Sequence, residues 1–178
     1  MLELLKLFEE ADYFSLSKGA HRDAHDPAGY TVLMSASASG SPDMVKEVLK
    51  LRPDVNAATE KQADSDGNED EKAAGRTALM EAVSHSDYDV APEGVNRNEV
   101  VRLLLKAGAD PNLRDQDGNT ALILCEGDAD MALLLIKAGA DVNAENNDGA
   151  TALSKTFDDD MQRVLRAHGA TGKARGEK

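Results

Sequence analysis

The stretch GADPNLRDQDGNTAL at residues 108–122 returns as GADVNAENNDGATAL at residues 139–153, with a short apolar segment between the two copies. A pattern that recurs at a fixed period of a few tens of residues indicates a stack of structural repeats. The stretch therefore predicts that the chain is built from similar units, each of which buries its apolar residues against its neighbours.

Paired glycines mark the limits of the pattern, and their separation is the same from Gly19 to Gly29, from Gly108 to Gly118 and from Gly139 to Gly149. The first Gly can end a helix in the left-handed conformation, and the second can occupy a tight turn. A threonine two residues further on can cap the next helix with its hydroxyl. These threonines are Thr31, Thr77, Thr120 and Thr151. We therefore expect each unit to contain an extended hairpin followed by helices.

The composition restricts the class of partner. The chain has 178 residues, which suits one domain with its own core. Hydrophobic residues make up 41% but aromatic residues only 3%, which favours closely packed small helices. The formal net charge of −13 disfavours nucleic acid and anionic membranes, because both would repel an acidic surface. A protein that is basic, or that carries a basic patch, is the favoured partner.

The sequence also suggests a compartment. Cys125 is the only cysteine, so no internal disulfide can form, which fits a reducing environment. The first ten residues lack the basic start and long apolar run of a signal peptide, and no stretch approaches the roughly 20 apolar residues that cross a bilayer. We expect a cytoplasmic protein in which Cys125 is a small buried hydrophobic residue.

The helix-start motif resembles that of the ankyrin repeat. It reads DPAGYTVLM at residues 26–34, GRTALM at 75–80, DQDGNTALI at 115–123 and DGATALS at 148–154, and the family's Gly-Ala-Asp-Val-Asn ending is complete at residues 139–143. The resemblance implies an all-α solenoid of stacked helix-turn-helix units with short β-hairpin-like fingers. The TALM and TALI variants, a prokaryotic style of repeat, replace the family's Thr-Pro-Leu-His. We therefore expect the hydrogen bonds of that His to be absent and the joints between units to be looser.

We expect a single domain at residues 1–170, with a cap at 1–25 and units at 26–56, 72–112, 115–143 and 146–170. The last two units are short, which predicts trimmed helices or tightened turns around Gly127 and Asp158. An acidic insertion at 57–74 is expected to be mobile, and an internal insertion at 84–98 is expected to be more ordered. Residues 171–178 are expected to form a flexible basic tail.

In ankyrin-repeat proteins, partners dock on the finger tips and on the concave face of the first helices. The resemblance therefore implies a non-catalytic protein–protein interaction module, favoured as a monomeric acidic adaptor or inhibitor, with neutralisation of a basic toxin or enzyme as one specific form. We expect no catalytic residue, metal or cofactor. The expected partner-binding residues are Tyr30, Arg76, Glu81, Tyr88, Arg114, Gln116, Asn119, Glu145 and Asn147. Exposed Tyr and Arg stand out among them, because these residue types are enriched in interface hot spots.

Two alternatives stay open. The segment DQDGN at residues 115–119 resembles the start of an EF-hand loop, so a calcium-responsive switch or a small enzyme would use Asp115, Asp117, Asn119 and Glu126. That loop needs Gly at its sixth position, where this chain has Thr120. The other alternative is a structural subunit of a larger assembly, docked through the short C-terminal units.

Overall fold

The computed structural model describes residues 25, 29–60, 74–84, 95–125, 127–174 and 176. The predicted cap apart from His25 and most of the two predicted insertions, including Tyr88, lie outside these residues, as does Glu126.

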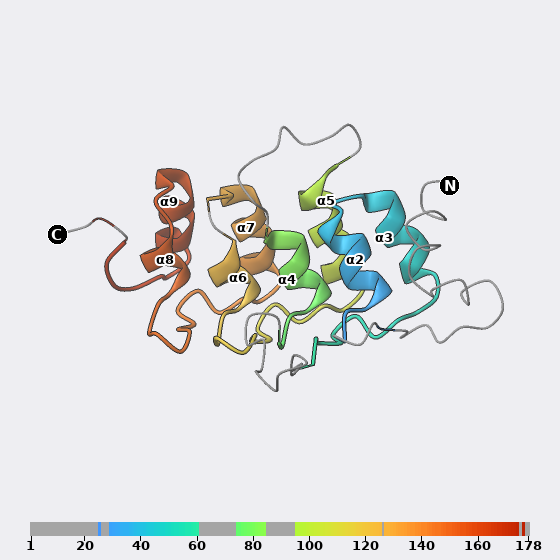
Figure 1. Cartoon of the computed structure of the whole chain (residues 1–178). Helices are drawn as coiled ribbons and strands as arrows, with labels where there is room; N and C mark the ends of the chain where they lie inside the picture. The colour runs from blue at the N-terminus through green and yellow to red at the C-terminus, as the bar shows by residue number, and fades with distance from the viewer. Residues whose placement is uncertain are drawn as a thin grey trace.

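The described residues form eight helices that are arranged in four pairs. The pairs are α2 (Val32–Ala38) with α3 (Pro42–Leu49), α4 (Ala78–Val83) with α5 (Arg97–Lys106), α6 (Ala121–Leu124) with α7 (Ala129–Lys137), and α8 (Ala152–Lys155) with α9 (Asp159–Ala167). Figure 1 shows the pairs side by side in chain order. Among the described residues, β-structure is limited to the isolated bridges His25–Thr31 and Ala58–Thr77. The all-α repeat architecture predicted from the sequence is confirmed.

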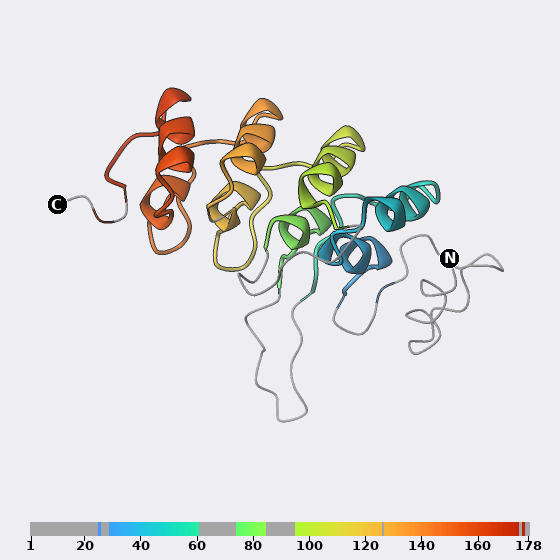
Figure 2. The same ribbon diagram turned by 90° about the horizontal axis from the view of Figure 1, so that it is seen from above.

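The helices form two layers. The first helices of the pairs contact one another in the order α2, α4, α6, α8, and the second helices contact one another in the order α3, α5, α7, α9. Figure 2 shows the two layers from above. We call the first layer the inner helices and the second layer the outer helices.

Each inner helix begins at one of the four predicted threonines. The Oγ1 atom of Thr31 accepts a hydrogen bond from the N–H of Met34 at 3.3 Å, and Thr77, Thr120 and Thr151 cap their helices in the same way. At two joints a different side chain bonds back to the threonine. The Sδ atom of Met34 accepts from Thr31 N–H at 3.3 Å, and Ser154 Oγ accepts from Thr151 N–H at 2.9 Å. These two joints therefore keep a reciprocal cap without the family's His.

Glycines end the units as predicted. Gly108, Gly139 and Gly169 have φ angles of 99°, 96° and 93°. The first unit differs, because Arg52 occupies the corresponding position after α3 with a φ of 55°. A side chain in this left-handed region is disfavoured, so the first unit tolerates local backbone strain.

The core runs along the stack between the two layers. Leu33, Leu79, Leu122 and Leu153 occupy the same position on the four inner helices, and each is at most 1% exposed. On the outer helices Leu104 and Leu135 are fully buried, whereas Leu103 and Leu134 beside them are only partly buried. The neighbours differ because a helix directs successive side chains to different faces.

The last two inner helices are trimmed, as the short units predicted. Helices α6 and α8 have four residues each, whereas α2 has seven. Gly127, with a φ of 88°, lies in one shortened turn, and Asp158 caps α9 after the other. Within the segment predicted as the tail, Thr171 is hydrogen-bonded to Asn143 and Ala174 is buried, so both residues contact the repeat stack.

Candidate functional site

The extended segments between one outer helix and the next inner helix form a row of fingers beside the inner helices. We define the fingers by their described residues: 53–60 with 74–77, then 107–120, then 138–151. Backbone hydrogen bonds join each finger to the next. The N–H of Gln116 donates to Ala74 O at 3.0 Å, and the N–H of Asn147 donates to Asp117 O at 2.9 Å. The fingers therefore present one continuous edge rather than three independent loops.

A repeated asparagine clamp fastens each unit to the next. The Nδ2 atom of Asn112 donates to Gly139 O at 2.9 Å, while its Oδ1 atom accepts from Asp141 N–H at 2.8 Å. Asn56 binds Gly108 O and Asp110 N–H in the same way, and Asn143 binds Gly169 O and Thr171 N–H. Asparagine is common in turns, so the residue type alone indicates no more than a turn former. The recurrence of these asparagines four residues after the helix-ending Gly or Arg was the signal of a shared role.

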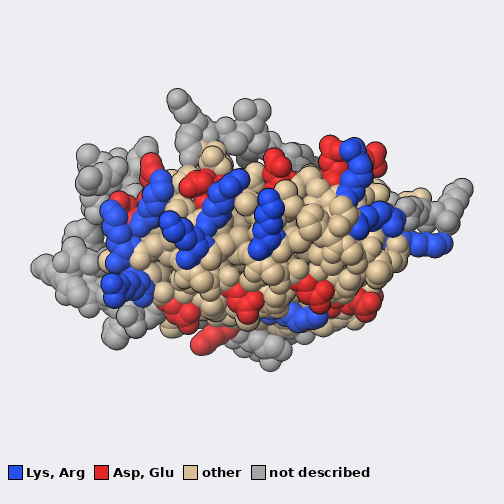
Figure 3. Space-filling model, turned by 180° about the vertical axis from the view of Figure 1, so that it is seen from behind, with Lys and Arg blue, Asp and Glu red and all other residues tan. Residues whose placement is uncertain are grey.

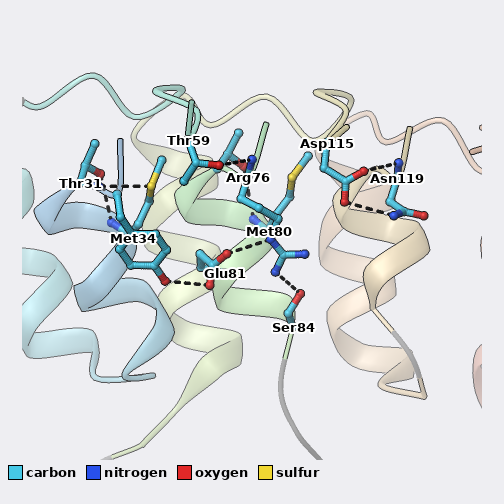
Figure 4. Close-up of polar contacts among 11 residues, drawn as sticks. Thr31, Met34, Thr59, Arg76, Met80, Glu81, Ser84, Asp115 and Asn119 are labelled. Atoms are coloured by element: carbon cyan, nitrogen blue, oxygen red, sulfur yellow. Dashed lines mark hydrogen bonds and ion pairs between the residues drawn. The ribbon is translucent and has the colours of Figure 1, made fainter. Parts of the chain in front are cut away.

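A polar network joins the first two units on the inner-helix side. The hydroxyl of Tyr30 donates to Glu81 Oε2 at 2.8 Å, and Arg76 Nε donates to Glu81 Oε1 at 2.8 Å. Arg76 Nη2 also donates to Ser84 Oγ at 2.7 Å. Figure 4 shows Arg76, Glu81 and Ser84 directed toward one another beside helix α4. The structure thus brings three of the predicted partner-binding residues into one cluster.

The burial of these residues corrects one expectation. Tyr30 and Arg76 were expected to be freely exposed, but both are partly buried, and the side chains of Arg76 and Glu81 are 17% and 16% exposed. Their polar groups are satisfied inside the protein. They can present their edges to a partner, but they are held in place before any partner arrives.

The second finger corrects a second expectation. Asn119 is 6% exposed rather than a free surface residue. Its backbone N–H donates to Asp115 Oδ1 at 2.7 Å, its Nδ2 donates to Asp115 Oδ2 at 3.1 Å, and its Oδ1 accepts from Asn146. Asn119 is buried because it connects the second finger to the third through Asn146. Figure 4 shows its contacts with Asp115.

The remaining predicted finger residues also make contacts between fingers. Arg114 Nη1 donates to Glu145 O at 2.6 Å, and Asn147 Nδ2 donates to Gln116 O at 2.8 Å. The side chains of Glu145 and Asn147 nevertheless remain exposed, together with Asp117 and Asp148. These exposed groups give the tips of the last two fingers an acidic character.

The geometry gives no support to the calcium hypothesis. Both carboxylate oxygens of Asp115 are hydrogen-bonded to Asn119, which is a turn-forming arrangement. Across the described part of the chain, no group of three His, Cys, Asp or Glu residues is placed to hold a metal ion.

Cys125 is buried, as the sequence predicted. It lies just after α6, and its Sγ atom is 3.6 Å from Asp128 O. Burial, followed by the negative charge of Asp128, raises the pKa of the thiol to about 12. The thiol is therefore protonated at neutral pH and is a poor nucleophile.

Charge is unevenly distributed along the chain. The described residues contain 13 Lys and Arg and 17 Asp and Glu, a net charge of −4, so −9 of the total net charge of −13 belongs to residues outside them. None of the described helices has the length and apolar character needed to cross a bilayer.

Comparison with known proteins identifies the repeat. The family model described as ankyrin repeats (3 copies) matches residues 4–93 and 90–167. The chain belongs to the ankyrin-repeat family. A relative from Treponema pallidum (strain Nichols), which is named as an ankyrin repeat-containing protein, is 30% identical to this chain over 132 residues. The match covers 74% of this chain and 35% of the relative, so the chain spans about a third of that protein's length. Ankyrin repeats serve protein–protein interaction, and the family is generally a non-catalytic binding module.

Proposed function

We propose that this ankyrin-repeat chain captures a protein partner on its finger tips and on the adjoining inner-helix face, and that it acts as an adaptor or inhibitor without catalysis. The observation that carries the proposal is the fixed surface formed by the fingers and the Tyr30–Glu81–Arg76 network. Groups held in place before binding lose little conformational freedom when a partner docks, which favours affinity.

The proposed partner has a basic surface. Asp117, Glu145 and Asp148 are exposed at the tips of the last two fingers, where their carboxylates would face an approaching protein. Opposite charges accelerate encounter and help to select the partner. A basic toxin or enzyme would fit this description, because acidic side chains can occupy the place of its anionic substrate.

The test first isolates the partner by capture on the intact chain from a lysate of the cells in which the chain occurs. The Kd of the chain for the purified partner is then measured. A variant with Asp117, Glu145 and Asp148 all changed to Ser should bind more weakly, and its Kd should depend less on salt. A matched variant with Asp43, Asp130 and Asp160 changed to Ser removes the same charge from the outer helices. Equal Kd values for the two variants would refute recognition by the finger tips.

A further inference from the structure

The outer-helix side carries a second charged surface. Figure 3 shows Lys and Arg side chains in a row across this face, with Asp and Glu side chains above and below the row. The basic row consists of exposed residues at or near the C-terminal ends of α3, α5 and α7: Lys46, Lys50, Arg52, Arg102, Lys106 and Lys137. These cations lie on a different layer from the inner helices and so do not belong to the surface described above.

Helix electrostatics explains part of the row. Cations near the C-terminus of a helix are stabilised by the helix dipole, and three of them also pair with acids one turn earlier. Lys46 binds Asp43 at 3.2 Å, Lys50 binds Glu47 at 2.6 Å, and Arg102 lies 4.0 Å from Glu99. By contrast, Arg52, Lys106 and Lys137 have no ion-pair partner within the described residues.

Helix electrostatics and ion pairing do not explain the presence of Arg52. It is the one non-glycine residue with a positive φ in the described part of the chain, and it occupies the position held by Gly108, Gly139 and Gly169 in later units. A Cβ atom at those three glycines would meet nothing within 4 Å, so space for a side chain exists at the corresponding place in every unit. Only the first unit fills it, at the cost of backbone strain. Strain retained in this way points to a role for the side chain.

We propose that the basic row binds an extended, acidic segment of a partner protein. Neighbouring helices pack about 8–10 Å apart, and an extended segment in the polyproline II conformation advances about 3.1 Å per residue with three residues per turn, so every third side chain faces the same side at intervals of about 9 Å. Acidic residues at every third position of the segment would therefore meet the cations of successive units. The segment would cross α3, α5 and α7 in turn, from Arg52 to Lys106 to Lys137.

The flanking charges select against a wider polyanion. Exposed Asp43 and Asp130 lie in the first turns of α3 and α7, and Asp54, Asp110 and Asp141 lie in the turns beyond the C-terminal ends. A nucleic-acid duplex would place phosphates against both acidic borders, whereas a single peptide strand fits between them. The arrangement thus favours an acidic peptide over nucleic acid.

The test uses the full chain and fluorescein-labelled peptides, with binding read as fluorescence anisotropy at 50 and 150 mM salt. One peptide carries Glu at every third position, and a second has the same composition with its Glu residues in one block. The spaced peptide should bind more tightly. Arg52→Gly and Lys106→Gln/Lys137→Gln should weaken its binding by roughly two- to fivefold for each charge removed, the range of exposed ion pairs. Lys173→Gln, which removes a charge outside the row, should leave the Kd unchanged.

The glycine variant separates binding from folding. Arg52→Gly relieves the left-handed strain, so its Tm should stay level or rise while its affinity falls. The proposal is overturned if both row variants bind like the unmodified chain, or if the blocked peptide binds as well as the spaced one. Tighter binding of a short DNA duplex than of the spaced peptide would also overturn it, and would assign the row to nucleic acid.

Discussion

The asparagine clamp makes a quantitative prediction about how the stack holds together. In Asn112→Ala, the unit that contains α5 loses both side-chain hydrogen bonds to the end of the unit that contains α7. Each such bond contributes about 0.5–1.5 kcal/mol, so the pair contributes about 1–3 kcal/mol. Because Asn112 is exposed, water replaces the lost partners, and we expect the lower half of this range, about 1–2 kcal/mol.

The effect on cooperativity is the more informative result. A repeat stack is stabilised by contacts between nearest neighbours, so a weakened joint lets the two sides unfold separately. Urea unfolding of Asn112→Ala, followed by far-UV circular dichroism, should show a lower midpoint and a smaller apparent m value. The Tm should fall by about 4 °C, as expected for a change of this size in a chain of this length.

Two further substitutions at the clamps act as controls. Asn112→Asp keeps the oxygen that accepts from Asp141 N–H but loses the donor to Gly139 O, so it should show about half of the destabilisation. Asn143→Ala affects only the attachment of residues 169–171, and it should leave the m value unchanged. If Asn112→Ala changed the free energy of unfolding by no more than Asn143→Ala and kept the m value, the clamp would not couple the units.

Three other predictions concern the core, the polar network and the thiol. Leu135→Ala should destabilise the fold by about 2–5 kcal/mol in urea titrations, and Leu134→Ala by clearly less, because only Leu135 is fully buried; equal effects would contradict the burial pattern. Glu81→Gln leaves Arg76 without its charged partner at a site that is about one-sixth exposed, so we expect a loss of about 1–3 kcal/mol in thermal or urea unfolding, and a smaller loss in 1 M salt would contradict the weak screening expected there. Because the pKa of the Cys125 thiol is raised to about 12, its contribution to stability is complete below pH 9 and is lost between pH 9 and 12, where only the thiol of the unfolded chain ionises. The free energy of unfolding should therefore fall by about 1.4 kcal/mol per pH unit in this range. Cys125→Ala should remove this slope.

Much of the fold was predictable because its signals are local. The spacing of Gly108 to Gly118 and the capping role of Thr120 depend on backbone conformations within a few residues, and the structure confirms both. The trimmed inner helices followed from counting the residues between such markers. The difference in burial between Leu135 and Leu134 is less apparent in the sequence, because both belong to one apolar run, LLLI at residues 133–136.

The surface was harder to predict because exposure depends on neighbouring units. Asn119 and Arg76 occupy variable positions of the motif, so they were expected to be free. In the structure one is buried against Asp115 and Asn146, and the other is paired with Glu81. Such contacts join residues from different units or from both sides of a helix start, and no short sequence pattern predicts them. The roles of the predicted partner-binding residues in recognition remain predictions.

The unequal lengths of the inner helices have a consequence for how a partner would be oriented. Helix α2 has seven residues and α8 has four, whereas the outer helices α3 and α9 have eight and nine. At 1.5 Å per residue, the inner wall falls from about 10 Å at one end of the stack to about 6 Å at the other. The wall is therefore wedge-shaped along the stack. A partner shaped to fill the tall end would collide or leave a gap if it were turned end for end. The wedge shape therefore favours one orientation of a partner along the stack.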